Sequence, residues 1–132
     1  MKLYISKNLN ISEEEAFILQ KRLYKQYGTT LFGLMKFYKL DPEEFLDFVH
    51  DINLSKLKQS KELKDNMDLL PGKKMIFTNG DEKWAKKILY ALGINNSVEK
   101  IFDIIKSDYI PKPQKKAYSN MIEMCKVNPK EC

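Results

Sequence analysis

Apolar residues in the first half of the chain recur every three or four positions, which is the spacing of amphipathic helices. Ser12 and Glu15 have the spacing of a capping box, which predicts that one of these helices begins at Ser12. Gly28 is predicted to end it, because glycine readily adopts the left-handed conformation that follows a helix. The apolar face between these two signals consists of Ala16, Leu19, Leu23 and Tyr27.

Three further helices follow in the predicted pattern. Thr29 and Thr30 each carry a hydroxyl that can cap the next helix. Asp41 followed by Pro42 predicts the start of another, with the aspartate as cap and the proline at the first helical position. The last of the three is predicted over about residues 60–70. The first half of the chain is therefore expected to be helical throughout.

The pattern changes in the second half of the chain. Residues 74–78 form a short apolar run without alternation, which predicts a strand buried on both faces of a parallel sheet. Asp81 is predicted to cap a helix that ends at Gly93, and a second strand is predicted over residues 101–105. A last helix is predicted after Pro113. Strands that alternate with helices are typical of a parallel α/β fold.

Two strands bury too little surface to stand alone as a parallel sheet. Residues 128–132 have the character of a lead-in to a further strand, and residues 1–5 are more typical of a helix interior than of a natural start. We therefore expect the chain to be a fragment of a longer protein rather than a complete small one.

Two positions are candidates for phosphate chemistry. Thr78 ends a predicted strand, at the edge of the sheet where α/β proteins bind ligands. Its hydroxyl and the backbone N–H groups of Asn79 and Gly80 can hold phosphate oxygens, although a plain strand-to-helix turn explains these residues equally well. Lys112 lies between two prolines, which hold it on a rigid loop. Taken alone, such a lysine is more often solvated than bound to a phosphoryl oxygen.

The sequence segments around these two positions resemble motifs of a known family. Residues 76–80 and 110–113 resemble the second and third motifs of the haloacid dehalogenase (HAD) superfamily, and their separation suits that family. Residues 27–31, 45–51 and 102–104 resemble stretches of its pyrimidine 5′-nucleotidase group. The likeness covers nearly the whole chain.

The resemblance implies an α/β fold with an N-terminal helical cap over residues 1–54 and a partial HAD-like Rossmannoid core, with a parallel sheet, over residues 55–132. It implies a Mg²⁺-dependent phosphatase that hydrolyses a phosphate monoester through an aspartyl-phosphate intermediate. Within the subgroup the substrate would be a pyrimidine nucleoside monophosphate. Thr78 would orient the phosphoryl group, and Lys112 would steady the nucleophile and the developing charge.

Within the implied cap, Thr29, Thr30 and His50 are candidates for substrate contact by position alone. His50 is the only histidine and neighbours Asp51, so a structural hydrogen bond or a hinge is favoured over general-base chemistry. Trp84 and the phenylalanines are expected in the core, and none is singled out as a platform for a pyrimidine base.

The chain departs from the family at both ends. The first motif, an Asp-x-Asp that supplies the nucleophile, occurs nowhere in the sequence, and the acidic pair that holds magnesium would lie beyond Cys132. We therefore expect no main metal ligand in this chain and no activity from it alone. Another HAD phosphatase or a dehalogenase shares the two motifs present, and a non-catalytic phospholigand-binding or interaction protein is the alternative of a different class.

Composition and charge argue against several other classes of protein. The net charge is +5, but the lysines are interleaved with glutamates, so we expect a solvated surface and no nucleic-acid partner. No apolar stretch has the length of a signal peptide or a membrane span. Cys125 and Cys132 suggest neither a disulfide framework nor a metal site. A cytoplasmic protein without membrane association is therefore expected, and the oligomeric state stays open.

Overall fold

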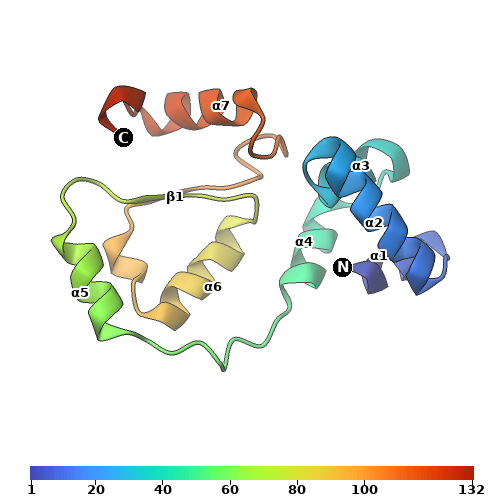
Figure 1. Ribbon diagram of the computed structural model, residues 1–132, viewed down its shortest axis with the longest axis horizontal. Helices are drawn as coiled ribbons and strands as arrows, with labels where there is room; N and C mark the ends of the chain where they lie inside the picture. The colour runs from blue at the N-terminus through green and yellow to red at the C-terminus, as the bar shows by residue number, and fades with distance from the viewer.

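The helical half of the chain folds into four helices that pack on one another, and we call residues 2–50 the helical lobe (Figure 1). The computed structural model describes all residues, 1–132. The four helices are α1 (Lys2–Leu9), α2 (Glu13–Tyr27), α3 (Thr30–Tyr38) and α4 (Pro42–His50). None of the helices in the protein has both the length and the apolar character needed to cross a bilayer.

The predicted capping residues begin α2, α3 and α4, and one of them ends α2. Ser12 and Glu15 make both halves of a capping box at the start of α2, and Gly28 ends that helix with a φ of 83°. The hydroxyl of Thr29 accepts the N–H of Phe32 at 3.2 Å and so caps α3. Asp41 caps α4. These predictions are confirmed, because each depends only on residues within one helical turn.

The helical lobe has a continuous apolar core. Gly33 of α3 lies so close to α2 that a Cβ at this position would be 2.7 Å from the side chain of Leu23. The core also receives Ile104, which comes from the second half of the chain and is 1% exposed. Its ten buried residues are Tyr4, Ile5, Ala16, Leu19, Leu23, Leu31, Leu34, Phe45, Leu46 and Ile104.

Residues 61–132 alternate helices with two strands, and we call them the α/β lobe (Figure 1). The strands β1 and β2 are parallel, with Ile76 opposite Ile101. Helices α6 and α7 lie on opposite sides of this sheet (Figure 1). The elements are α5 (Lys61–Leu69), β1 (Met75–Phe77), α6 (Glu82–Leu92), η1 (Asn95–Ser97), β2 (Lys100–Phe102), α7 (Lys115–Cys125) and η2 (Pro129–Glu131). The protein is thus a helix-rich α/β structure with a small parallel sheet.

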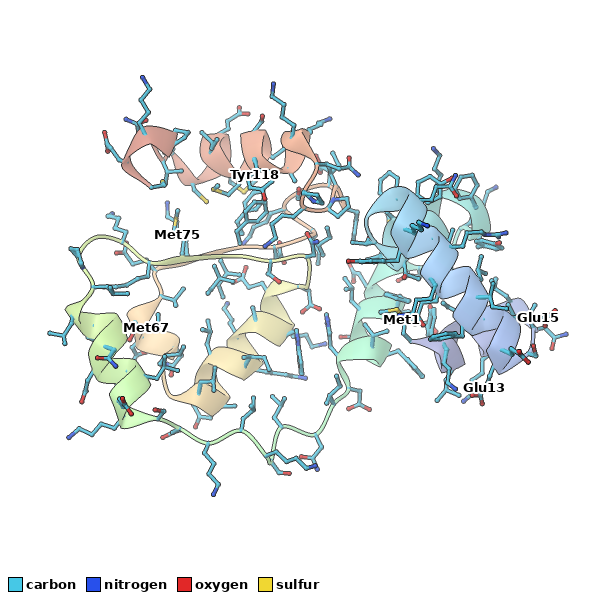
Figure 2. All side chains as sticks on the ribbon, in the orientation of Figure 1. Met1, Glu13, Glu15, Met67, Met75 and Tyr118 are labelled. Atoms are coloured by element: carbon cyan, nitrogen blue, oxygen red, sulfur yellow. The ribbon has the colours of Figure 1, made fainter.

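Aromatic side chains join the sheet to α7. Met75 and Tyr118 point into the space between β1 and this helix (Figure 2). The ring of Phe77 meets the edges of Phe102 and Tyr118, each at 5.3 Å between ring centroids. Edge-to-face contacts of this kind add to the free energy gained from burying the rings.

The sheet differs from the prediction in its burial and its length. β1 is half-buried rather than buried on both faces, because β2 is the only strand that pairs with it. The strand predicted over residues 101–105 ends at Phe102, since the Asp103 carboxylate accepts the N–H groups of Glu82 at 2.8 Å and Lys106 at 2.9 Å. These bonds turn the chain out of the sheet.

Residues 128–132, which have the character of a lead-in to a strand, hold a short 3-10 helix. Helix α5 buries none of its residues. The expectation that the phenylalanines lie in the core is wrong in part. Three phenylalanines are exposed, which are Phe17, Phe37 and Phe48. Phe37 and Phe48 still contact one other ring each, those of Tyr27 and Tyr4.

Candidate functional site

The turn after β1 begins the candidate site. The N–H of Thr78 donates to the carbonyl of Phe102 at 3.0 Å, which extends the ladder of the sheet by one bond. The hydroxyl oxygen of Thr78 accepts the N–H of Gly80 at 2.9 Å. The Gly80 N–H, predicted to hold a phosphate, is therefore used inside the turn. The hydroxyl proton of Thr78 and the backbone N–H of Asn79 have no such partner and remain available to a ligand.

The side chain of Asn79 holds Lys112 at the same end of the sheet. Its Nδ2 donates to the carbonyl of Lys112 at 3.1 Å, and its Oδ1 accepts the N–H of Lys112 at 2.8 Å. The Nζ of Lys112 then donates to the carbonyl of Phe77 at 2.5 Å and lies 4.8 Å from the centre of the Phe77 ring. The two predicted positions, Thr78 and Lys112, thus lie together at the carboxyl end of β1, which is where parallel sheets bind ligands.

A cavity of about 640 Å³ lies between the two lobes. Five of the residues singled out from the sequence line it, which are Thr29, Thr30, His50, Asn79 and Lys112. Its lining includes two lysines and no aspartate or glutamate. Such a cavity favours an anionic ligand, because no carboxylate opposes a negative charge there.

Thr78 and Gly80 do not line this cavity. The tip of Thr78 is directed into the turn that it closes with Gly80, so its contribution to a ligand is limited to its hydroxyl proton. The structure therefore brings Asn79, Lys112 and the three candidates of the helical lobe to one cavity, and it places Thr78 beside that cavity rather than in its wall.

The hydroxyl groups of Thr29 and Thr30 make hydrogen bonds within the helical lobe. Thr29 accepts the N–H of Phe32 as the cap of α3. Thr30 is 5% exposed, and its hydroxyl donates to the carbonyl of Gln20 at 3.2 Å. The hydroxyl proton of Thr30 is therefore engaged, whereas that of Thr29 stays free to meet a ligand.

His50 joins the lobes. Its Nδ1 lies 2.6 Å from Oδ2 of Asp81, and its ring stacks on Trp84 with 5.0 Å between centroids and 2° between planes. The other carboxylate oxygen of Asp81 caps α6 by accepting the Trp84 N–H at 2.6 Å. The structural hydrogen bond expected of His50 is present. Its partner was missed because a capping aspartate shows no sequence signal that its second oxygen binds a residue 31 positions away.

A second contact between the lobes is exposed. The Nζ of Lys83 on α6 lies 2.5 Å from Oδ1 of Asp47 on α4. The hydrogen bond and charge of Lys83 lower the pKa of Asp47 and, reciprocally, those of Asp47 raise the pKa of Lys83. An exposed pair of this kind contributes little to stability, since water and salt screen it.

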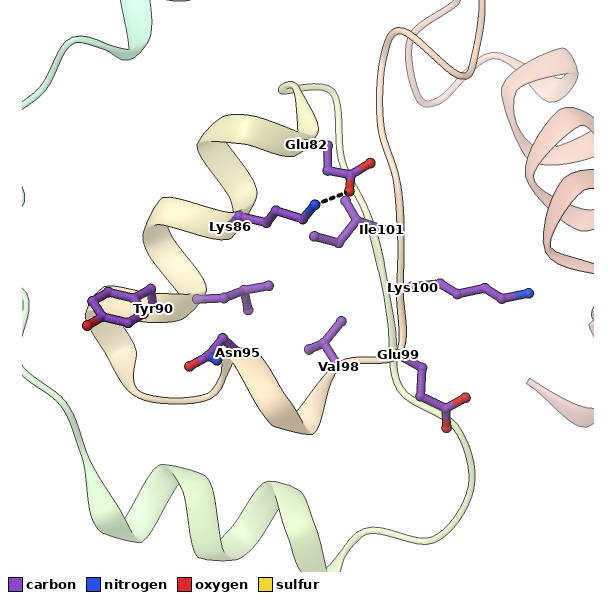
Figure 3. Close-up of a pocket in the computed structure, with 9 residues that line it drawn as sticks. Glu82, Lys86, Tyr90, Asn95, Val98, Glu99, Lys100 and Ile101 are labelled. Atoms are coloured by element: carbon purple, nitrogen blue, oxygen red, sulfur yellow. Dashed lines mark ion pairs between the residues drawn. The ribbon is translucent and has the colours of Figure 1, made fainter.

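Another pocket, of about 490 Å³, lies between α6, η1 and β2 (Figure 3). Its wall carries Glu82 and Glu99, and Glu82 pairs with Lys86 at 2.6 Å. Hydrogen bonds from Lys106 and then Lys86 lower the pKa of Glu82. The charge of its wall is therefore mixed and partly neutralised, which makes this pocket a poor site for a phosphate.

The cavity between the lobes does not offer a magnesium site. Mg²⁺ prefers carboxylate and other oxygen ligands in octahedral geometry. The lining of the cavity contains no carboxylate, and no group of three or more His, Cys, Asp or Glu side chains could hold a metal ion. The residues of this chain do not by themselves fit the cofactor that the motif resemblance implies.

No protein-family model matches the chain, and no curated protein sequence matches it.

Proposed function

We propose that the cavity between the lobes binds a phosphate monoester, and that the chain is part of a HAD-type phosphatase of the pyrimidine 5′-nucleotidase group. In this proposal the α/β lobe is a partial HAD-like core and the helical lobe is its cap. The observation that carries the proposal is the clamp formed by Asn79, which holds Lys112 beside Thr78 at the carboxyl end of β1. The two motifs that prompted the resemblance meet at this point.

The available donors suit a phosphate. Lys112 supplies a positive charge, and the Thr78 hydroxyl and the Asn79 N–H supply neutral donors nearby. Charge-assisted hydrogen bonds to an oxyanion are about twice as strong as neutral ones. To bind a phosphoryl oxygen, the Nζ of Lys112 exchanges its bond with the Phe77 carbonyl for one with the ligand.

The size of the cavity supports a ligand larger than phosphate. Its volume of about 640 Å³ is within the range of small-molecule sites, about 300–1,000 Å³. The wall formed by the helical lobe combines apolar residues with Tyr24 and Lys25, and a leaving group would lie against it. We propose a nucleoside monophosphate, with a pyrimidine base, as the ligand.

Hydrolysis through an aspartyl phosphate requires a carboxylate nucleophile that this cavity lacks. We therefore propose that the 132 residues bind the monoester without hydrolysing it, and that residues outside them would supply the nucleophile and the metal ligands. The carboxylate-free wall also favours a second candidate, a phospholigand-binding protein without catalysis. Both candidates bind the same ligand. They differ in whether residues outside this chain supply a nucleophile.

Titration with uridine monophosphate tests the proposal. We expect Lys112→Ala to weaken binding about tenfold or more, because one charge-assisted hydrogen bond contributes about 1.5–3 kcal/mol. Lys115→Ala is the matched control, since Lys115 is exposed on α7 and does not line the cavity. Calorimetry measures both, and the same samples with magnesium should release no inorganic phosphate.

Equal affinity in the two variants, or no binding by the unaltered chain, would refute the proposed site. Phosphate release by the unaltered chain would refute the proposal that the nucleophile is supplied from elsewhere.

A further inference from the structure

His50 is held rigidly with one ring nitrogen unused. Nδ1 is bonded to Asp81, one face of the ring stacks on Trp84, and no hydrogen bond involves Nε2. The side chain is 18% exposed and lines the same cavity as Lys112. A fixed imidazole with a free nitrogen at a cavity wall is arranged for contact with a ligand.

The partners of His50 are themselves fixed. Asp81 is 7% exposed, and its Oδ1 accepts the backbone N–H of Trp84 while its Oδ2 faces His50. Trp84 therefore holds the aspartate through its backbone and the histidine through its ring. A carboxylate at Nδ1 accepts the proton of that nitrogen and so leaves Nε2 as the ring nitrogen that can meet a ligand.

We propose that His50 is a ligand-binding residue of the cavity, which in its protonated form donates from Nε2 to an oxygen of the bound phosphate monoester. Asp81 and Trp84 are its positioning residues. The inference rests on the proposed function, because it takes Lys112 as the other cation that meets the ligand. Two donors, one from each lobe, then bind the same anion.

The surrounding charges are consistent with this role. The carboxylate of Asp47, three residues earlier on α4, is paired with Lys83 and so only partly available to His50. Asp81 is the only carboxylate bonded to the imidazole. The charged groups near His50 are Asp81 at the start of α6, Lys83 on α6, Asp47 on α4 and Asp51 directly after His50. Lys25 and Lys112 line the same cavity.

The same contacts would also serve a purely structural joint between α4 and α6, and substitutions separate the two roles. His50→Asn keeps a donor near the position of Nδ1, within reach of Asp81, and removes Nε2. His50→Gln keeps a neutral donor near the position of Nε2. Asp81→Asn keeps an oxygen that can cap α6, because asparagine caps as well as aspartate, and removes the charge that orients the imidazole.

Sulfate is the probe, because its charge does not change between about pH 5 and 8, where imidazole does. We expect the unaltered chain to bind sulfate about tenfold more tightly at about pH 5.5 than at about pH 8, since the imidazolium adds a charge-assisted hydrogen bond. His50→Asn should lose this difference. His50→Gln should bind with an affinity that is independent of pH, and Asp81→Asn should shrink the difference.

The chain contains one histidine and one tryptophan, so each gives a single signal. Nuclear magnetic resonance of the imidazole should show sulfate moving the midpoint of the His50 titration to higher pH. Trp84 fluorescence should follow the same midpoint, because a protonated imidazole stacked on an indole quenches it. Circular dichroism establishes that each variant is folded, and Asp81→Asn provides the test if a His50 variant is not.

Three results are distinguishable. Sulfate affinity that depends on Lys112 but not on pH, or a pH dependence that His50→Asn retains, overturns the role of His50 and leaves the proposed function standing. Sulfate affinity that is indifferent to Lys112→Ala refutes the proposed phosphate site, and the inference fails with it. A pH dependence that requires His50, together with a shifted imidazole titration, supports the inference.

Discussion

The two lobes bury their residues in different ways. The helical lobe has a core of ten buried residues that draws on all four helices, and only Ile104 comes from elsewhere. In the α/β lobe, α5 buries nothing and β1 is half-buried. The buried apolar residues that belong to this lobe alone are Leu89, Ile94, Phe102, Ala117 and Cys125.

The residues that stabilise the fold and the clamp of the candidate site therefore lie mainly in different lobes. Helices satisfy their backbone groups internally and need only a neighbour for one face, so four short helices form a core by themselves. A sheet of two strands has two open edges and little area to cover. Side-chain hydrogen bonds such as those of Asn79 and Asp103 add to the packing of the α/β lobe, and the bonds of Asn79 belong to the candidate site.

We expect the largest loss of stability on substitution in the core of the helical lobe. Leu34 is 0% exposed and Leu89 is 7% exposed. We expect Leu34→Ala to lower the free energy of unfolding by about 4 kcal/mol and Leu89→Ala by about 2 kcal/mol, because cost rises with the cavity that the structure cannot collapse. Urea denaturation of the two variants measures both. Equal losses would show that the α/β lobe is as tightly packed as the helical lobe.

A smaller loss of stability is expected at the clamp, together with a loss of binding. Asn79→Ala removes two hydrogen bonds to Lys112 and should lower the free energy of unfolding by about 1–2 kcal/mol. Affinity for uridine monophosphate should fall about tenfold, because Lys112 is no longer held beside β1. Asn95→Ala is the control, as the Asn95 side chain bonds only to Asn96. Unchanged affinity in Asn79→Ala would show that the clamp does not position the lysine.

The smallest effect is expected where the lobes meet at the surface. Lys83 lowers the pKa of Asp47, so this pair stabilises the fold above the ordinary pKa of an aspartate and loses that contribution as pH falls through the lowered pKa. Urea midpoints of the unaltered chain and Asp47→Asn should therefore differ slightly at neutral pH and converge in acid. They should also converge in about 1 M salt, where the screening length is about 3 Å. A difference that persists in acid would assign the effect to something other than the ion pair.

Local signals in the sequence predicted helices in both lobes, although not α1. Ser12, Gly28, Asp41 and Asp81 begin or end helices as expected, because a cap involves residues no more than one turn apart. The apolar run before Thr78 predicted the first strand for a similar reason. It did not predict how deeply that strand is buried, which depends on how many strands pair beside it.

Only the tertiary structure decided which of these local elements meet. Asn79 and Lys112 are 33 residues apart, and no pattern along the chain indicates that a carboxamide would bind both backbone groups of the lysine. The pairing of His50 with Asp81 and the insertion of Ile104 into the helical core are long-range in the same way. Sequence alone determined where most helices and both strands begin, because their signals are local. The candidate site was decided by packing, since it requires residues of two lobes to be close in space when they are distant in the chain.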